Sequence, residues 1–314
     1  EYVRNFLASQ QADFNMNFQE FLKLYYDDMT PRLRENTMRN KKYIIDLKIL
    51  PYFSNKRMNS ITAADIRKWQ NELISQGYSQ TYLRTISNQL TAVFNYAVRY
   101  YDLQNNPCRK AGGMGKNKAD VMKFWTKDEF YKFIDSIMDK QKSYAAFMTL
   151  FWTGMRLGEL LALTPADIDF ENKTISISKS YQRLDGKDVI TLPKTPKSKL
   201  TITVPDFLLA DLKDYMNSIY CLEDTDRLFQ VTKYFMEHEM QRGIKNSGVK
   251  RIRIHDIRHS HCALLFEMGI TPLEVADRLG HERVETTMNV YAHIYPNKQR
   301  ALSDKLEKVY REDL

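Results

Sequence analysis

The sequence is poor in cysteine and lacks the long apolar run of a membrane-spanning helix. Its three cysteines, Cys108, Cys221 and Cys262, are an odd number with no paired spacing. We therefore expect free thiols in a reducing compartment, and neither a disulfide framework nor a zinc site. No apolar stretch approaches the roughly 18 residues that a transmembrane helix needs, so we expect no membrane partner.

Signatures of nucleotide and metal chemistry are also missing. The sequence has no phosphate-binding P-loop and no acidic cluster of the kind that holds Mg²⁺ in nucleases. Five histidines lie near the C-terminus, but no cysteine or carboxylate accompanies them at a ligand spacing. They are His255, His259, His261, His281 and His293. We therefore expect no metal and no cofactor.

Positive charge, by contrast, is in excess. In 314 residues, 47 lysines and arginines against 39 acidic residues give a formal net charge of +8. Such an excess favours a polyanionic partner without proving one. The hydrophobic share of 43% and the charged share of 27% are those of a globular protein of one large or two ordinary domains.

The first hundred residues have the apolar spacing of helices. Thr62 and Asp65 form a capping pair at the start of one of them. The expected helices cover about residues 14–29, 34–47, 62–76 and 79–97. Together they predict a small bundle.

The polar side chains of this bundle have two interpretations, a solvated surface or a DNA-binding face. Thr81, Arg84 and Asn88 share one face of the fourth helix and suit a DNA groove. A basic segment with three glycines follows at 108–123. Its composition fits a flexible linker, a segment that contacts DNA phosphates, or both. The candidate DNA contacts are Arg39, Lys41, Lys42, Thr81, Arg84, Asn88, Arg109, Lys110, Lys116 and Lys118.

The second half begins with a helix capped by Thr126, and a buried helix runs from Tyr144 to Thr153. Asp185-Gly186 is a hairpin turn signal between alternating stretches. These stretches are Thr174–Gln182, Lys187–Leu192 and Leu200–Val204. We expect one small antiparallel sheet in a mainly helical domain, with helices again after Pro205.

Four separated motifs carry candidate chemistry, although each is weak by itself. They are G-x-R-x-G-E-L at 154–160, H-x-x-R at 255–258, L-G-H at 279–281 and a tyrosine at 291. A guanidinium binds two phosphate oxygens at once. Two arginines beside a tyrosine therefore suit a site that holds a phosphodiester while a phenol attacks it.

The joint pattern resembles the tyrosine recombinase (phage-integrase-like) family, most specifically over 153–160 and 255–293. Within that family it looks most like the integrases of phages and conjugative transposons. The resemblance implies a mainly α fold with a small antiparallel β-sheet, in which a helical core-binding (SAM-like) bundle precedes an α/β catalytic domain. The implied parts are the end of a removed arm-binding region at 1–13, the bundle at 14–107, the linker at 108–123, the catalytic domain at 124–296 and a tail helix at 297–314. The tail either packs in cis or docks onto a neighbour.

The resemblance also implies a role for each motif residue. Arg156 and Arg258 clamp the scissile phosphate, and His281 donates a further hydrogen bond to it. Tyr291 is the nucleophile, with His255 as the general base.

Three further roles are less settled. Lys194 resembles the general acid of the family, with Lys197 and Lys199 as close rivals. Glu159 and Asp256 orient the arginine and histidine. Tyr295 is a rival nucleophile, but it precedes Pro296 and fits the motif poorly.

The implied activity is metal- and ATP-independent breakage and rejoining of duplex DNA at attachment sites or transposon ends, through a 3′-phosphotyrosyl link and a Holliday junction. The implied assembly is a homotetramer on DNA in the bacterial cytoplasm, at the nucleoid, with an excisionase or a host DNA-bending protein as candidate partners. The alternatives are a housekeeping Xer-like resolvase, a catalytically silent DNA-binding protein and a type IB topoisomerase.

Overall fold

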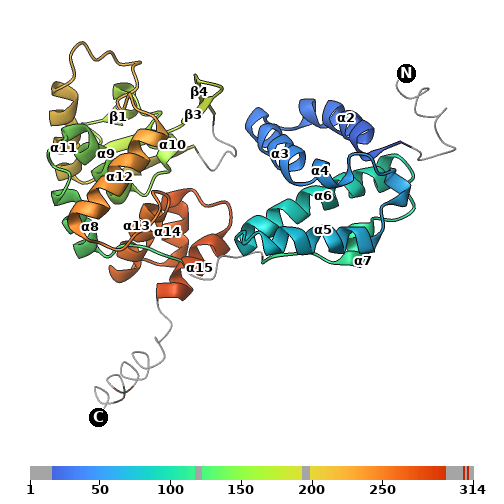
Figure 1. The fold of residues 1–314 in the computed structure, drawn as a ribbon. Coiled ribbons are helices and arrows are strands. Elements are labelled where there is room, and N and C mark those ends of the chain that lie inside the picture. Colours follow the sequence, from blue (N-terminus) through green and yellow to red (C-terminus); the bar gives the residue numbers. More distant parts are fainter. Residues whose placement is uncertain (1–15, 117–121, 193–198, 295–306, 308–309, 311–314) are drawn as a thin grey trace. The chain divides into compact units, whose positions relative to one another are not determined.

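The structure, a computed structural model, describes residues 16–116, 122–192 and 199–294 together with Glu307 and Tyr310 (Figure 1). The chain divides into two compact units, residues 1–120 and residues 121–314. Each has its own hydrophobic core. The domain bounds expected from the sequence stay a prediction, and residues 1–13 and most of the tail lie outside the described residues.

The N-terminal unit is a helical bundle, and its four long helices are those expected from the sequence. Asn17, Thr62 and Ser79 cap three of them by accepting a hydrogen bond from a backbone N–H of the first turn. The elements are α2 (Phe18–Met29), η1 (Thr30–Arg32), α3 (Glu35–Lys48), α4 (Leu50–Phe53), η2 (Met58–Ser60), α5 (Ala63–Ser75), α6 (Gln80–Tyr100) and α7 (Pro107–Ala111).

The segment after the bundle is more ordered than a flexible linker at its start. Cys108, Ala111 and Met114 are buried in the core of the N-terminal unit. The side-chain amide of Gln70 donates to the carbonyl oxygen of Gly112 at 2.8 Å. The part of the expected linker that the structure describes, residues 108–116, therefore packs as α7 and a loop against the bundle, because its apolar residues are spaced to reach the core.

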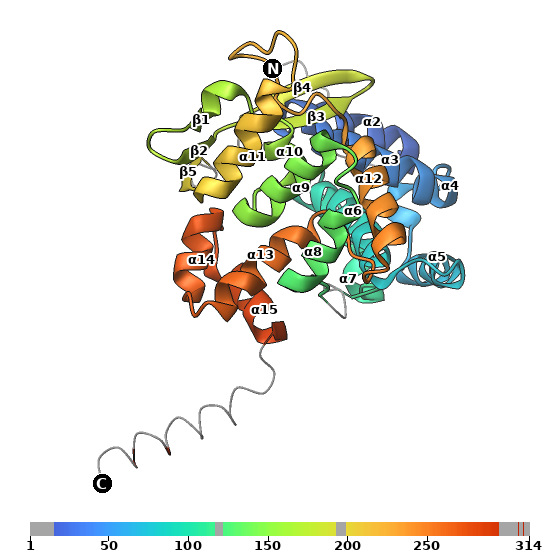
Figure 2. The same ribbon diagram turned by 90° about the vertical axis from the view of Figure 1, so that its left-hand side faces the viewer.

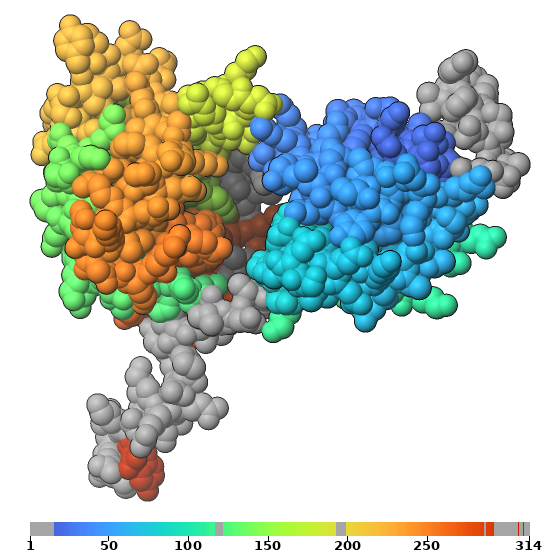
Figure 3. All heavy atoms as spheres, viewed as in Figure 1, coloured from blue at the N-terminus to red at the C-terminus, as the bar shows by residue number. Residues whose placement is uncertain are grey.

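The described part of the C-terminal unit is mainly helical with two small sheets. Its described elements are α8 (Lys127–Asp135), α9 (Gln141–Thr153), α10 (Leu157–Leu160), η3 (Pro165–Asp167), β1 (Ile168–Asp169), β2 (Thr174–Ile177), β3 (Ser180–Leu184), β4 (Lys187–Thr191), β5 (Leu200–Thr203), α11 (Asp206–Asn217), α12 (Lys233–Ser247), α13 (Asp256–Glu267), α14 (Pro272–Leu279) and α15 (Val284–Ile294). Figures 1 and 2 show α13, α14 and α15 grouped at one end of this unit and the β3–β4 hairpin toward the other. Side chains of α12 and the segment after it cover much of the face seen in Figure 3 (orange).

The strands form two sheets where the sequence predicted one. One sheet has the order β1-β2-β5, and the β3–β4 hairpin is separate. The expected strand at 174–182 breaks between Ile177 and Ser180, so that β2 pairs with β5 while β3 pairs with β4. The hairpin turn at Asp185-Gly186 is confirmed: both residues have positive φ, 48° and 79°, as a two-residue turn requires.

The core of the C-terminal unit surrounds α9, whose expected burial up to Thr153 is confirmed. Trp125 lies just before α8 with no exposed surface, and its indole N–H donates to the carbonyl of Lys250 at 2.8 Å. Gly243 of α12 lets that helix approach Phe133 of α8 closely. In the described part of the chain, no helix combines the length and the apolar character that crossing a bilayer requires.

Candidate active site

Arg156 is held at the turn between α9 and α10 by the acid three residues later. The carboxylate of Glu159 accepts from the backbone N–H of Arg156 at 2.7 Å and from its Nη1 at 2.7 Å. Glu159 is buried, whereas the side chain of Arg156 is 40% exposed. This geometry orients the guanidinium and leaves part of it accessible.

Arg258 joins three of the four sequence motifs. It lies on α13 and is 4% exposed. Its Nη1 donates to the carbonyl of Gly154 at 2.8 Å, and its Nη2 donates to the carbonyl of Leu279 at 2.6 Å. Two of its five N–H groups are thus used to join the loop after α9 to the end of α14.

A glycine is required at the junction next to this arginine. Gly154 ends α9 in the left-handed conformation, with φ 68°. A Cβ atom there would lie 2.6 Å from Cδ2 of His261 and 2.6 Å from Cδ2 of Leu279. The glycine therefore allows both the turn and the close approach of α13 and α14.

His281 follows the left-handed C-cap of α14, Gly280 (φ 62°). Its backbone N–H donates to the carbonyl of Ala276 at 2.9 Å, and its Nδ1 lies 2.7 Å from the hydroxyl oxygen of Thr287. Burial and then the charges of Arg258 and Arg156 lower the pKa of His281 to about 3. The imidazole is therefore neutral at physiological pH.

Tyr291 and His255 come from the two helices around this point. Tyr291 lies on α15, partly buried, and packs edge-on against Phe266 with the ring centroids 5.0 Å apart. His255 immediately precedes α13 and is exposed on one side. Burial of the rest of the ring and the charge of Arg258 lower its pKa below the ordinary value, which keeps it an acceptor of protons at neutral pH.

A pocket in the C-terminal unit gathers the two arginines. Its lining is Thr153, Met155, Arg156, Glu159, Ile177, Leu200, Arg258, Arg278, Leu279 and Gly280. Tyr291, His255 and His281 are not among the described lining residues. The pocket is thus a cationic cavity beside the other motif residues.

Asp256 has a neighbour as its hydrogen-bond partner, and the candidate general acids are described only in part. Asp256 accepts three hydrogen bonds from Arg253, one from its backbone and two from its guanidinium, at 2.8 to 3.1 Å. Within the described residues it makes no hydrogen bond to His255. Lys194 and Lys197 lie outside the described residues, and Lys199 is exposed just before β5, next to the pocket residue Leu200.

No group of three or more metal-ligating side chains occurs in the part of the chain that the structure describes. His261 is instead a core residue, 2% exposed, whose Nε2 accepts from Nε of Arg278 at 3.4 Å. His259 lies edge-on to His255, with ring centroids 5.5 Å apart. Burial and the neighbouring His255 lower the pKa of His259 to about 4.

Comparison with known proteins identifies the family. Residues 123–298 match the Phage integrase family, and residues 17–74 match the phage integrase N-terminal SAM-like domain. The ICEBs1 integrase of Bacillus subtilis (strain 168) is 34% identical to the chain, over 93% of this chain and 83% of that protein. The chain belongs to the phage integrase family. It is a tyrosine recombinase, a site-specific integrase of a mobile element that breaks and rejoins DNA.

More distant relatives share the fold of this integrase. The transposase from transposon Tn916 of Enterococcus faecalis is 22% identical, over 88% of this chain and 74% of its own. The Tn1549 transposon integrase in complex with a circular intermediate DNA superposes with a TM-score of 0.77 at 22% identity, covering 91% of this chain and 99% of that one. A lambda integrase tetramer bound to a Holliday junction gives a TM-score of 0.68 at 17% identity, covering 90% and 79%.

The candidate DNA contacts of the integrase differ in how available they are. Arg39, Lys42 and Asn88 are exposed, whereas Lys41 is half-buried. The ammonium of Lys41 donates to the hydroxyl of Tyr25 at 2.9 Å and to the side chain of Gln89 at 2.8 Å. Because these bonds occupy it inside the bundle, Lys41 is a weaker candidate than its neighbours.

The remaining candidates lie near the end of the unit. Arg84 lies against Gly113, where a side chain on that glycine would collide with it, and Thr81 is half-buried one turn before it. Arg109, Lys110 and Lys116 are exposed, and Lys118 lies outside the described residues.

Two residues of the site were missed by the sequence analysis. Arg278 is a third arginine of the pocket, and its Nη2 donates to the carbonyl of Thr203 at 3.2 Å. Thr287 is fully buried against His281. The only available signal was spacing: Thr287 precedes Tyr291 by four residues, one helical turn, on the same face of α15.

Proposed function

We propose that this integrase cleaves duplex DNA by attack of Tyr291 on a phosphodiester held by Arg156 and Arg258. The phenolic oxygen forms a bond to phosphorus as the bond to the 5′-oxygen breaks, giving a 3′-phosphotyrosyl link and a free 5′-hydroxyl. The 5′-hydroxyl of a partner duplex then reverses the step. Because the phosphotyrosyl ester conserves the free energy of the broken phosphodiester bond, the cycle needs no nucleotide cofactor.

The observation that carries the proposal is the position of Arg258. This buried guanidinium hydrogen-bonds only neutral carbonyl groups among the described residues, those of Gly154 and Leu279. Its positive charge therefore remains available to an anion in the pocket, where Arg156 supplies a second guanidinium. Fixed cations at this point stabilise the charge that develops in phosphoryl transfer.

Proton transfer is assigned to two further groups. His255 takes the proton of Tyr291, since its lowered pKa keeps it neutral and able to accept at physiological pH. The acid that protonates the leaving 5′-oxygen is Lys194, with Lys197 and Lys199 as its rivals. Glu159 orients Arg156 through two hydrogen bonds.

We further propose a homotetramer acting on two duplexes at the ends of a mobile element. This proposal is supported by the fold shared with the lambda integrase that was solved as a tetramer on a Holliday junction. The exposed basic residues of α3 and of the α7 region supply candidate phosphate contacts, so the affinity for DNA should fall steeply with salt.

The test uses nicked duplexes taken from the DNA that flanks the gene. A nick beside the cleavage position lets the short 5′-hydroxyl fragment diffuse away and traps the covalent adduct. Protein and duplex are mixed in EDTA and separated on a denaturing gel. We expect a shifted covalent band that is absent for Tyr291→Phe and retained for Tyr295→Phe.

The opposite outcomes are equally informative. A band that disappears with Tyr295→Phe and remains with Tyr291→Phe would reassign the nucleophile. A wild-type protein that binds these duplexes in a mobility-shift assay and forms no adduct would support the catalytically silent DNA-binding alternative.

A further inference from the structure

Thr287 makes an unusual use of its hydroxyl for a threonine inside a helix. In α9, the hydroxyls of Thr149 and Thr153 donate to the carbonyl four residues earlier, at 2.7 and 2.6 Å. This is the common arrangement for helical threonines. The hydroxyl of Thr287 in α15 instead lies 2.7 Å from Nδ1 of His281.

The surroundings of this hydrogen bond define its direction. Thr287 has no exposed surface, and among the described residues its hydroxyl makes no second hydrogen bond. If the hydroxyl oxygen accepted a hydrogen bond from Nδ1–H, its own O–H would be a buried donor without a partner, which costs more than an unused lone pair. Donation from Thr287 to Nδ1 is therefore the favoured arrangement.

The direction of the bond decides which nitrogen of His281 carries hydrogen. With a pKa of about 3, the ring is neutral and has a single N–H. If Nδ1 accepts from Thr287, that hydrogen is on Nε2. The charges of Arg258 and Arg156 act on the same ring, and Leu279 and Gly280, which precede His281 in the chain, line the pocket that holds both arginines.

We propose that Thr287 is a positioning residue that holds His281 in the Nε2–H tautomer, so that the neutral imidazole donates a hydrogen bond to the scissile phosphate. The inference rests on the function proposed above and deepens it. Because Thr287 and Tyr291 are one turn apart on α15, the docking of one helix both delivers the nucleophile and sets the donor.

The test compares Thr287→Val, which keeps the shape and removes the hydroxyl, with Thr287→Ser, which keeps the hydroxyl. The first readout is the single-turnover rate of adduct formation on the nicked flanking duplex. We expect Thr287→Val to lower this rate roughly 10- to 100-fold, the range found when a partner that orients a metal-ligating histidine is removed. Thr287→Ser retains the hydroxyl and its hydrogen bond. Its rate should therefore stay within about threefold of the wild type, which corresponds to about 0.6 kcal/mol.

The second readout is independent of activity. Nitrogen-15 NMR of histidine-labelled protein distinguishes a protonated from an unprotonated ring nitrogen, and His281→Gln assigns the signal. We expect Nε2–H in the wild type and in Thr287→Ser, and a mixture of tautomers in Thr287→Val. A wild-type spectrum with hydrogen on Nδ1, or a Thr287→Val rate within twofold of the wild type, would overturn the inference.

The two readouts separate this inference from the proposed function. If the wild type forms no adduct, the proposed function fails on that DNA, while the NMR spectrum still decides the tautomer. If Thr287→Val does not fold, the wild-type and Thr287→Ser spectra decide it.

Discussion

The buried imidazole of His261 predicts a loss of stability in mild acid. His261 lies on α13 with 2% of its surface exposed. Burial, and then the charge of the adjacent Arg278, lower its pKa to about 3 in the folded protein. In the unfolded chain the imidazole regains its ordinary pKa of about 6.5.

The sign and size of the effect follow from these two values. Between pH 6.5 and pH 3 the unfolded chain binds a proton at His261 that the folded protein does not, so stability falls as pH falls. Each pH unit is worth about 1.4 kcal/mol per group. At pH 5, one and a half units below the unfolded value, His261 alone should therefore cost about 2 kcal/mol of unfolding free energy.

The assay is urea unfolding at pH 8 and at pH 5 for the wild type and for His261→Gln, followed by tryptophan fluorescence, to which Trp125 and Trp152 of the same unit contribute. The glutamine can still accept from Arg278 but does not titrate. Because the other histidines are present in both proteins, the difference between the two isolates His261. We expect the stability advantage of the wild type to shrink by about 2 kcal/mol from pH 8 to pH 5.

A matched control is available on the surface of the same unit. His238 of α12 is exposed, so His238→Gln, measured at the same two pH values, controls for replacing a histidine by glutamine without disturbing the core. A wild-type advantage over His261→Gln that stays constant from pH 8 to pH 5 would refute the reasoning.

Two further predictions concern stability. Gly154→Ala should cost about 1–2 kcal/mol for the left-handed backbone and a further 1–3 kcal/mol or so for its collision with His261 and Leu279; Gly248→Ala, where φ is 70° and nothing lies within 4 Å of the added carbon, should show the backbone cost alone. Equal urea midpoints for the two variants would contradict this. Glu239→Gln should lower the free energy of unfolding by about 3 kcal/mol, whereas Glu237→Gln, at an exposed position on the same helix, should change it little. A similar loss for both variants would show that burial of the charge is unimportant.

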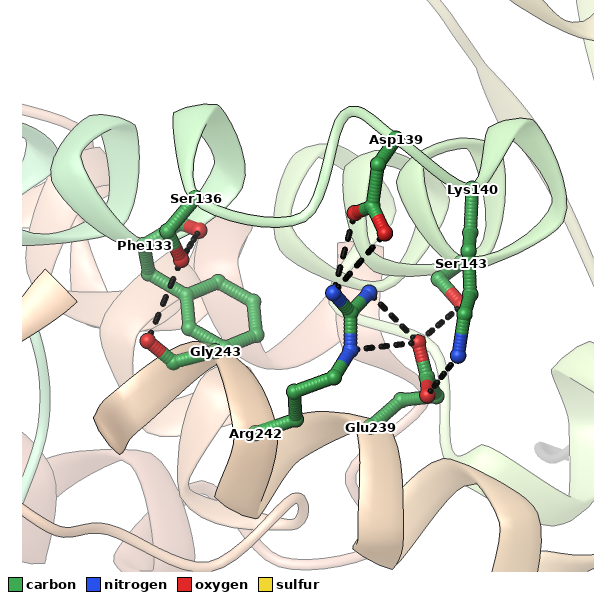
Figure 4. Close-up of polar contacts among 8 residues, drawn as sticks. All are labelled: Phe133, Ser136, Asp139, Lys140, Ser143, Glu239, Arg242 and Gly243. Atoms are coloured by element: carbon green, nitrogen blue, oxygen red, sulfur yellow. Dashed lines mark hydrogen bonds and ion pairs between the residues drawn. The ribbon is translucent and has the colours of Figure 1, made fainter. Parts of the chain in front are cut away.

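The expected loss of stability in Glu239→Gln follows from the network in Figure 4. The carboxylate of Glu239 is 3% exposed and accepts from Lys140 and Ser143 at the start of α9 and from Arg242 one turn along α12. Burial opposes its ionisation, but these bonds outweigh it and lower its pKa to about 2. The neutral amide would leave two cations without their shared partner.

The helices of the integrase were predictable because their signals are local. The capping boxes at Thr62 and Thr126 are present as expected, and the apolar face of α6 is buried as its spacing predicts. The two-sheet arrangement was not predictable, because alternation identifies a strand and not its partner. β2 pairs with β5 across the whole β3–β4 hairpin, a choice made by packing.

The site shows the same division. Glu159 was expected, from the family resemblance, to orient Arg156, and the two side chains form an ion pair at 2.7 Å. Asp256 lies three residues after Arg253, the same separation as in the first pair, and the ion pair between them fixes the orientation of its carboxylate. Thr287 and Arg278 gain their significance only from residues that tertiary packing brings beside them, and the spacing of Thr287 from Tyr291 was not enough to identify it.

The two arginines of the pocket are held by different means, and this difference matters for anion binding. Arg156 is paired with the carboxylate of Glu159, so part of its charge is offset within the protein. Arg258 is buried and, within the described residues, forms no ion pair with a carboxylate. Burial and repulsion from Arg156 lower its pKa to about 10, which means that the folded chain holds this charge at a cost. The phosphate that we propose to bind between the two guanidiniums would offset that cost, so the proposed site holds its cationic charge before the anion binds.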